Sequence, residues 1–271
     1  MRKSTKIIKG SNQREILLDI TFPETSNNKL VVFSHGFKGF KDWGCFDLIA
    51  QNFAQNGFTF LKLNFSHNGT IVSDPLNFVD LEAFGNNNFS KELNDLGFVL
   101  DWVENNLNIS DISLLGHSRG GGISILKAGE DKRVTRVMSW ASPSSFLNRM
   151  PEDRIEIWKE KGVAFVYNGR TKQNMPMYIQ FYKDCIANKE RLNIKKSVRS
   201  LKIPHLIIHG ESDPTVLVKE AKDLHKWNMN SELFVVNNAD HVFGGSHPYD
   251  STELPKELQE VVDKTMDFIS R

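Results

Sequence analysis

Residues 116–120 of this chain have the pattern Gly-x-Ser-x-Gly, with Ser118 at the centre, and they directly follow an apolar run at residues 112–115. A strand that turns sharply into a helix holds the residue at the turn in a strained, exposed conformation. Glycine has no Cβ, so Gly116 and Gly120 let the backbone pass close to the serine side chain. The pattern predicts a serine nucleophile, and a serine hydroxyl is reactive only when a base takes its proton.

Two residues farther along the chain are suited to activate Ser118. Asp213 comes four residues after an expected strand at 204–209, and His241 follows another expected strand at 232–236. The loops after parallel strands open at one edge of a sheet, where ligands bind. We therefore predict that His241 is the base and that Asp213 fixes its tautomer and stabilises its charged form.

Both assignments have competitors in the sequence. His209 ends a strand and His247 lies farther along the loop of His241, so each is an alternative histidine. Glu211 and Asp240 are alternative acids, although Asp240 adjoins His241 and does not easily reach its ring.

A tetrahedral intermediate also needs two N–H donors for its oxyanion. The backbone N–H of Arg119 follows the nucleophile, and that of Phe37 lies in the loop after the strand at 30–34. These two groups are the predicted oxyanion hole. His35, Gly36 and His117 flank the site, and we place them among the substrate-contacting residues, with the two histidines hydrogen-bonding neighbouring loops rather than acting as bases.

Three cations near these motifs leave a question open. Lys38, Lys41 and Arg119 either meet an anionic substrate or remain solvated side chains.

Apolar runs typical of buried strands alternate with amphipathic segments along most of the chain. The expected strands are residues 6–9, 15–22, 30–34, 58–63, 112–115, 134–140, 204–209 and 232–236. The expected helices are residues 46–55, 91–107, 119–129, 215–227 and 255–269, and residues 66–89 have the composition of a loop. The alternation predicts an α/β fold, with a mostly parallel, doubly wound sheet and helices on both faces.

The alternation stops between residues 142 and 200. This segment has helical spacing at 152–161 and 177–188, so we expect an inserted helical cap that divides the α/β core into residues 1–141 and 201–271.

Large apolar side chains are frequent in the segment. Trp158, Phe165, Met175 and Tyr178 either line a pocket for the acyl or leaving group or form the core of the segment itself.

Composition narrows the function classes. Lys and Arg total 34 against 33 Asp and Glu, which gives no reason to expect a nucleic-acid or membrane partner. Cys45 and Cys185 fit no metal spacing and are expected to be free thiols, as in a reducing compartment. The first residues lack the apolar stretch of a signal peptide, so the expected location is cytoplasmic.

These motifs together resemble the α/β-hydrolase superfamily over nearly the whole chain. The matching pieces are His35-Gly36-Phe37, the Ser118 pentapeptide, residues 209–213 and Asp240-His241. Within the superfamily the chain is similar to bacterial cinnamoyl/feruloyl esterases and to the dienelactone-hydrolase-like and prolyl-oligopeptidase-like branches. The resemblance implies the fold, a cap over the site, and acyl-serine hydrolysis without a metal or cofactor.

Two positions depart from the family pattern. Arg119 stands where many of these esterases carry Gln or Met, and residues 167–171 match no cap of assigned specificity.

Three functions are compatible with the sequence. The first is a serine hydrolase of small to medium carboxylic esters, with acyl or aryl groups that include hydroxycinnamoyl as an option. The second is a peptidase of the prolyl-oligopeptidase or aminopeptidase type, for which Glu152, Asp153 and Glu156 are candidate amine ligands or simply a solvated helix face. The third is a non-catalytic binding protein, which the complete set of predicted catalytic groups argues against. The expected partner is a small-molecule ester, and the oligomeric state is open.

Overall fold

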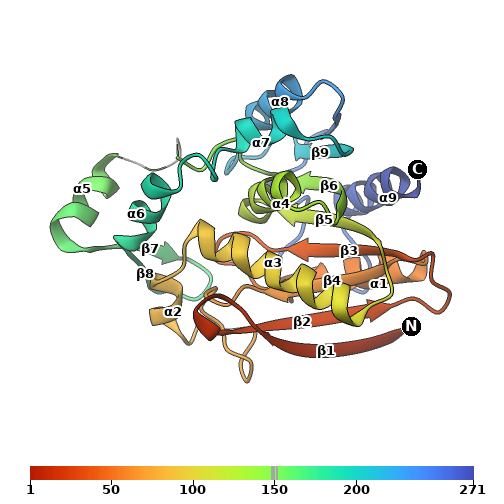
Figure 1. Ribbon diagram of the computed structural model, residues 1–271, viewed down its shortest axis with the longest axis horizontal. Coiled ribbons are helices and arrows are strands. Elements are labelled where there is room, and N and C mark those ends of the chain that lie inside the picture. The colour runs from red at the N-terminus through yellow and green to blue at the C-terminus, as the bar shows by residue number, and fades with distance from the viewer. Residues whose placement is uncertain (148–149, 151) are drawn as a thin grey trace.

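The computed structural model of the chain describes residues 1–147, 150 and 152–271. Eight strands form one sheet in the order β1-β2-β4-β3-β5-β6-β9-β10 (Figure 1). β1 and β2 pair antiparallel, as do β2 and β4, and all other neighbours are parallel. The strands are β1 (Arg2–Lys9), β2 (Glu15–Phe22), β3 (Lys29–Ser34), β4 (Thr59–Asn64), β5 (Asp111–His117), β6 (Val134–Trp140), β9 (His205–Gly210) and β10 (Glu232–Val236).

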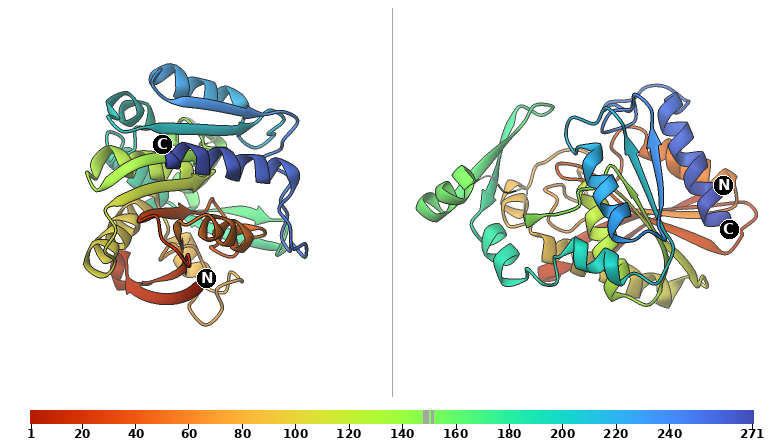
Figure 2. Two further views of the ribbon diagram at one scale, coloured as in Figure 1. Left: turned by 90° about the vertical axis from the view of Figure 1, so that its right-hand side faces the viewer. Right: turned by 90° about the horizontal axis from the view of Figure 1, so that it is seen from above.

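Helices cover both faces of the sheet, because residues along each buried strand alternate between two cores. Leu30 and Val32 of β3 belong to one core and Val31 and Phe33 to the other. The first core contains α3 (Phe89–Asn106), α4 (Arg119–Glu130) and α8 (Val218–Trp227); the second contains α1 (Phe46–Gln55) and α9 (Lys256–Ser270). The predicted doubly wound α/β fold is therefore confirmed (Figure 2).

The segment at residues 142–200, which we call the insert, differs in part from the prediction. It contains α5 (Glu152–Lys161), α6 (Gln180–Ala187) and α7 (Ile194–Ser200), but also an antiparallel hairpin of β7 (Val163–Asn168) and β8 (Gln173–Tyr178). The expectation of a helix beginning at residue 177 was wrong, because residues 177 and 178 are the end of β8. Residues 148, 149 and 151 of the predicted cap lie outside the described residues.

The insert lies at the edge of the sheet toward which β3 points, and α5 with the β7–β8 hairpin projects away from the sheet (Figures 1 and 2). The stretch expected to be a loop at residues 66–89 contains the short helix α2 (Leu81–Gly85), which contacts β8. A 3₁₀ turn at Ser11–Gln13 joins β1 to β2.

Two further features concern the cysteines and the possibility of a membrane-spanning helix. Cys45 and Cys185 are both free thiols, as expected, and both are buried. None of the described helices combines the length and the apolar character that crossing a bilayer requires.

Candidate active site

Ser118 occupies a sharp turn between β5 and α4. Its backbone has φ 56° and ψ −125°, outside the regions that most residues adopt. Its N–H donates to the carbonyl of Trp140 over 2.8 Å, and its own carbonyl accepts from the N–H of Gly121 over 2.9 Å. The surrounding backbone thus holds the serine in the strained geometry that the pattern predicts.

The two flanking glycines are required by close backbone contacts. A Cβ on Gly116 would lie 2.1 Å from the carbonyl oxygen of Gly120. A Cβ on Gly120 would lie 2.2 Å from the carbonyl oxygen of Ser34 in β3. Since both obstacles are backbone atoms, one in α4 and the other in β3, neither position has room for a side chain.

His241 lies between Ser118 and Asp213. Its Nδ1 is 2.7 Å from Oδ2 of Asp213, and its Nε2 is 3.0 Å from Oγ of Ser118. An ionised carboxylate only accepts, so Nδ1 carries the proton of the neutral ring and Nε2 is free to accept the serine proton. The structure therefore brings the three predicted residues into one hydrogen-bonded chain.

The carboxylate of Asp213 is buried and held by its own loop. Its Oδ1 accepts the N–H groups of Thr215 and Val216 at 2.8 and 2.9 Å. Burial raises the pKa of Asp213, but hydrogen bonds from His209, His241 and the Val216 N–H outweigh it, so the pKa is below its usual value. Asp213 is thereby kept ionised beside the ring that it orients.

The competing histidines and carboxylates make other contacts than the one to Ser118. His209 is buried, with its Nε2 2.7 Å from the carbonyl of Val216 and 3.3 Å from Oδ2 of Asp213, so it braces the aspartate loop. His247 accepts the N–H of Gly44 on Nδ1. Among the acids, Glu211 is exposed and accepts the N–H of Asn238.

The remaining acid competitor, Asp240, is exposed. It accepts the N–H groups of Val242 and Gly244 in its own loop.

The two residues of the predicted oxyanion hole, Phe37 and Arg119, both line the Arg119 side of the space at Ser118. Phe37 follows β3 in a loop that passes Ser118, since a Cβ built on the preceding Gly36 would lie 3.0 Å from Cβ of Ser118. Among the described residues, the Phe37 N–H has no hydrogen-bond acceptor. Arg119 is the first residue of α4, where backbone N–H groups lack a partner within the helix. Both groups are available to a ligand at Ser118.

The flanking histidines make loop contacts. Nε2 of His117 lies 2.8 Å from the carbonyl oxygen of His241, and Nδ1 of His35 lies 2.9 Å from that of Gly36. Burial lowers the pKa of His117 to about 3 and that of His35 to about 4, so both rings are neutral near pH 7. A neutral ring donates to these carbonyls, which gives both residues a positioning contact.

Two cavities meet at Ser118. The first, which we call the Arg119 cavity, has a volume of about 220 Å³. Its lining comes from the core and the insert and consists of Phe37, Phe89, Ser118, Arg119, Pro143, Phe146, Met150, Arg154, Trp158, Met177, Phe181, Thr215 and Val216. The second, which we call the His241 cavity, has a volume of about 170 Å³ and is lined by Gly36, Phe37, Lys38, Gly39, Trp43, Phe46, His117, Ser118, His241 and Val242. The serine thus has space on two sides.

The predicted substrate-contacting residues divide between these cavities and other positions. Trp158 lines the Arg119 cavity, and Gly36 and His117 line the His241 cavity. Phe165 is 58% exposed on β7, and Met175 is fully buried in the apolar core. Neither is among the described residues that line the cavities at the serine, and the burial of Met175 matches the alternative of a core residue in the segment.

Two further predicted contacts also lie outside the cavity linings. The hydroxyl of Tyr178 donates to Glu82 over 2.5 Å, linking β8 to α2. His35 is buried behind its loop.

The three cations near the motifs have different surroundings in the structure. Lys41 is buried and pairs with Asp19 and Asp42. Lys38 lines the His241 cavity and donates to the carbonyl of Tyr167 in the insert. Of these three cations, Arg119 alone lines the Arg119 cavity, between the serine and the insert.

Glu92 is a residue at this site that the sequence did not indicate. It lies on α3, is buried, and its Oε1 is 3.4 Å from Nη1 of Arg119. The two residues are 27 positions apart, so only the packing of α3 against α4 brings them together. No local signal in the sequence could have found this pair.

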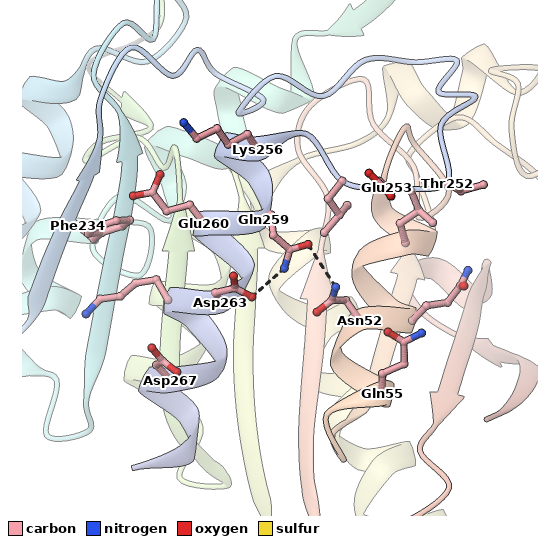
Figure 3. A pocket seen from close by; sticks show the side chains of 14 residues that line it. Asn52, Gln55, Phe234, Thr252, Glu253, Lys256, Gln259, Glu260, Asp263 and Asp267 are labelled. Carbon is pink, nitrogen blue, oxygen red and sulfur yellow. Dashed lines mark hydrogen bonds between the residues drawn. The ribbon is translucent and has the colours of Figure 1, made fainter.

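A larger groove of about 830 Å³ lies away from Ser118, between α1 and α9 (Figure 3). Gln259 there accepts from Asn52 and donates to Asp263. Ser118, Asp213 and His241 are absent from the described lining of this groove. We therefore do not assign the groove to the site, although it is larger than the cavities at Ser118.

Comparison with known proteins identifies the fold. No protein-family model matches the sequence, and no curated protein sequence matches it significantly. Among solved structures, Est1E from Butyrivibrio proteoclasticus with bound ferulic acid is similar with a TM-score of 0.75 and 16% identity, over 97% of each chain. The chain has the α/β-hydrolase fold.

Other structures with this fold are similar over almost the full length. A putative hydrolase from Agrobacterium vitis S4 has a TM-score of 0.76 at 18% identity, over 99% of this chain and 100% of its own. The esterase domain of a Rhodothermus marinus protein has a TM-score of 0.63 at 18% identity, over 90% of this chain and 91% of its own. At these identities the likeness concerns the fold.

Proposed function

We propose that this protein is a serine hydrolase that cleaves carboxylic esters through an acyl-serine intermediate. The observation that carries the proposal is the chain of contacts from Ser118 through His241 to Asp213, at 3.0 and 2.7 Å. The strained turn at Ser118 and the free N–H of Phe37 add the other parts that acyl transfer requires.

The reaction follows from these positions. Oγ of Ser118 attacks the ester carbonyl carbon while Nε2 of His241 takes its proton, and Asp213 stabilises the resulting imidazolium. The N–H groups of Phe37 and Arg119 stabilise the negative oxygen of the tetrahedral intermediate. His241 then returns the proton to the departing alkoxide as the C–O bond breaks, and a water repeats both steps to release the acid.

The two cavities suggest how an ester is oriented. The leaving oxygen must come within reach of His241, which lines only one of the two cavities. We therefore assign the alcohol portion to the His241 cavity and the acyl portion to the Arg119 cavity. The insert supplies Trp158, Phe181 and other apolar walls of the acyl side, in support of its role as a cap.

A peptidase that holds a substrate amine would need carboxylates at the site. The described lining of the two cavities contains Arg119, Arg154 and Lys38 but no Asp or Glu. The three acidic residues considered for this role, Glu152, Asp153 and Glu156, are exposed on α5. The charge of the cavities favours an ester with no amine near the reacting bond.

An activity-based probe tests the proposal directly. A fluorophosphonate should add one adduct to the native protein, and peptide mapping should place it on Ser118. Ser118→Ala should lose both the adduct and the hydrolysis of 4-nitrophenyl acetate and butyrate. Ser212→Ala, which changes an exposed serine in the loop of Asp213, is the matched control and should keep both. Full hydrolysis by folded Ser118→Ala would overturn the assignment.

A further inference from the structure

The Arg119 cavity has two guanidinium groups in its wall and no acidic side chain among its described lining residues. Arg119 comes from α4 and Arg154 from α5 of the insert, so the core and the insert each contribute one cation. A cavity lined by charges of one sign favours a ligand of the opposite sign.

Arg119 is held in place chiefly by aromatic rings. Its guanidinium carbon lies 4.0 Å from the ring centre of Phe37 and 4.9 Å from that of Phe89. Its side chain is only 12% exposed, and burial lowers its pKa despite the nearby Glu92. A guanidinium has five N–H donors, yet Arg119 makes a single side-chain hydrogen bond within the described chain. The group is therefore fixed in orientation while most of its donors are unused.

Glu92 compensates this charge incompletely. The distance of 3.4 Å between Nη1 and Oε1 is long for an ion pair, and the same Oε1 accepts from Asn87 over 2.7 Å. The other oxygen, Oε2, is buried without a partner in the described structure. Burial raises the pKa of Glu92, although Arg119 and Asn87 act to lower it. A second anion at Arg119 would meet donors that Glu92 does not occupy.

Arg154 provides the second cation. It is partly buried on α5 and, within the described part of the chain, forms neither an ion pair nor a hydrogen bond. An arginine that borders a cavity and forms no ion pair within the described part of the chain is suited to a ligand carboxylate, whose two oxygens match its planar fork.

The remaining wall is apolar. Phe89, Phe146, Trp158, Met177 and Phe181 line the same space, so it also suits a hydrocarbon chain or ring. The lining thus combines an apolar passage with cationic groups, and the nucleophile opens into it.

We propose that the preferred substrates are esters whose acyl group ends in a second carboxylate, that is, half-esters of small dicarboxylic acids. This inference rests on the proposed esterase function and on the assignment of the acyl group to the Arg119 cavity. The ester carbonyl lies at Ser118, the hydrocarbon portion contacts the aromatic wall, and the free carboxylate binds Arg119 and Arg154.

The test compares two substrates that differ in one group. Monoethyl glutarate and monoethyl adipate carry the acyl carboxylate, and the ethyl esters of the matching ω-carboxamides replace it by a neutral group of similar shape. The native enzyme should show a kcat/KM ratio of anionic to neutral ester of about 10 to 100, as expected for hydrogen bonds to a charged group. Arg119→Met and Arg154→Gln should each lower this ratio about tenfold.

A matched control and a measurement on the native protein complete the design. Arg191→Gln removes an arginine that pairs with Glu130 away from both cavities, and it should leave the ratio unchanged. Because Arg119→Met removes a buried group and is at risk of misfolding, inhibition of the native enzyme is measured as well. Glutarate should inhibit hydrolysis of a neutral ester competitively and at least about tenfold more tightly than glutaramide, in which neutral amides replace both carboxylates.

The outcomes separate the two proposals. A native ratio near 1, with neutral esters still hydrolysed through Ser118, overturns the anionic-acyl inference and leaves the esterase function standing. A ratio that persists in both arginine variants overturns it too. If no ester is hydrolysed and the fluorophosphonate leaves Ser118 unmodified, the esterase function itself fails.

Discussion

His117 donates its Nε2–H to the backbone carbonyl of His241 over 2.8 Å, so the residue before the proposed nucleophile fixes the loop that carries the proposed base. The two rings lie 4.9 Å apart between centres. Burial lowers the pKa of His117 to about 3, with the nearby His241 acting in the same direction. His117 therefore remains a neutral donor over the pH range in which an esterase operates, and its contribution is positional.

This contact predicts a specific kinetic defect. In His117→Ala the loop of His241 loses its anchor, and misplacement of a catalytic group costs about 10- to 100-fold in kcat. KM should change little because the apolar walls of the cavities remain. His117→Gln, whose amide is also a donor, should recover part of the rate. Steady-state kinetics on one neutral ester would measure this, and equal kcat values for the native protein and His117→Ala would contradict it.

The choice among three carboxylates gives a second prediction. Asp213→Asn should lower kcat by about 10³-fold or more, because an amide stabilises the wrong tautomer of His241 and no developing charge. Glu211→Gln lies in the same loop but is exposed, and Asp240→Asn adjoins His241 while facing its own loop. Each should retain kcat within about threefold, since neither side chain contacts the imidazole ring. A loss in Glu211→Gln equal to that in Asp213→Asn would refute the assignment.

The glycines of the turn make a third prediction, on stability. Gly116→Ala places a methyl group 2.1 Å from the carbonyl oxygen of Gly120, and the backbone must move to relieve it. The free energy of unfolding should fall by at least about 3 kcal/mol, or the protein should fail to fold. Gly169→Ala is the matched control, because its Cβ would meet nothing closer than a Tyr167 ring atom at 4.0 Å. Urea denaturation of both variants would be read against the native protein, and equal midpoints for the two would contradict the geometric argument.

Much of the arrangement around Ser118 follows from local signals in the sequence. The apolar run before Ser118 and the helical segment after it set the turn, and parallel strands place the loops of Asp213 and His241 at the same edge. Because these signals lie within a few residues of each group, they can be interpreted without knowing which distant residues the group contacts. The same holds for Phe37, which lies three residues after the end of β3.

The insert was harder to predict because its signals conflict. Residues 163–168 are rich in β-branched and aromatic residues, which favours a strand, but the partner strand contains Pro176 and two methionines. Side chains alternate between the two faces of the hairpin, and Phe165 lies on the face exposed to solvent. The spacing of apolar residues along one strand does not indicate which of its faces will be covered.

Contacts between distant segments could not be predicted from the sequence for another reason. The pairing of Glu92 with Arg119 depends on how α3 packs against α4, and helix packing is set by whole surfaces rather than by two residues.

A fourth prediction concerns acid stability and uses a histidine outside the site. His205 begins β9 and is fully buried, with its Nε2 3.1 Å from Oγ of Ser139. Burial lowers its pKa to about 3, with His225 acting in the same direction, whereas a histidine in the unfolded chain titrates at about 6.5. Between pH 3 and pH 6.5 the unfolded state therefore binds one more proton at this residue than the native state. Stability must rise with pH across that window and fall on acidification.

His205→Gln removes this difference in bound protons while keeping a polar side chain at Ser139. Between pH 5 and 6, the slope of the unfolding free energy against pH should be shallower than in the native protein by about 1.4 kcal/mol per pH unit, which corresponds to one proton. Urea denaturation at pH 5.0, 5.5 and 6.0 measures both slopes, and comparison of slopes cancels any constant loss of stability from the substitution itself. Parallel lines would mean that His205 binds its proton equally in the folded and unfolded chains, which its burial at the start of β9 beside β6 argues against.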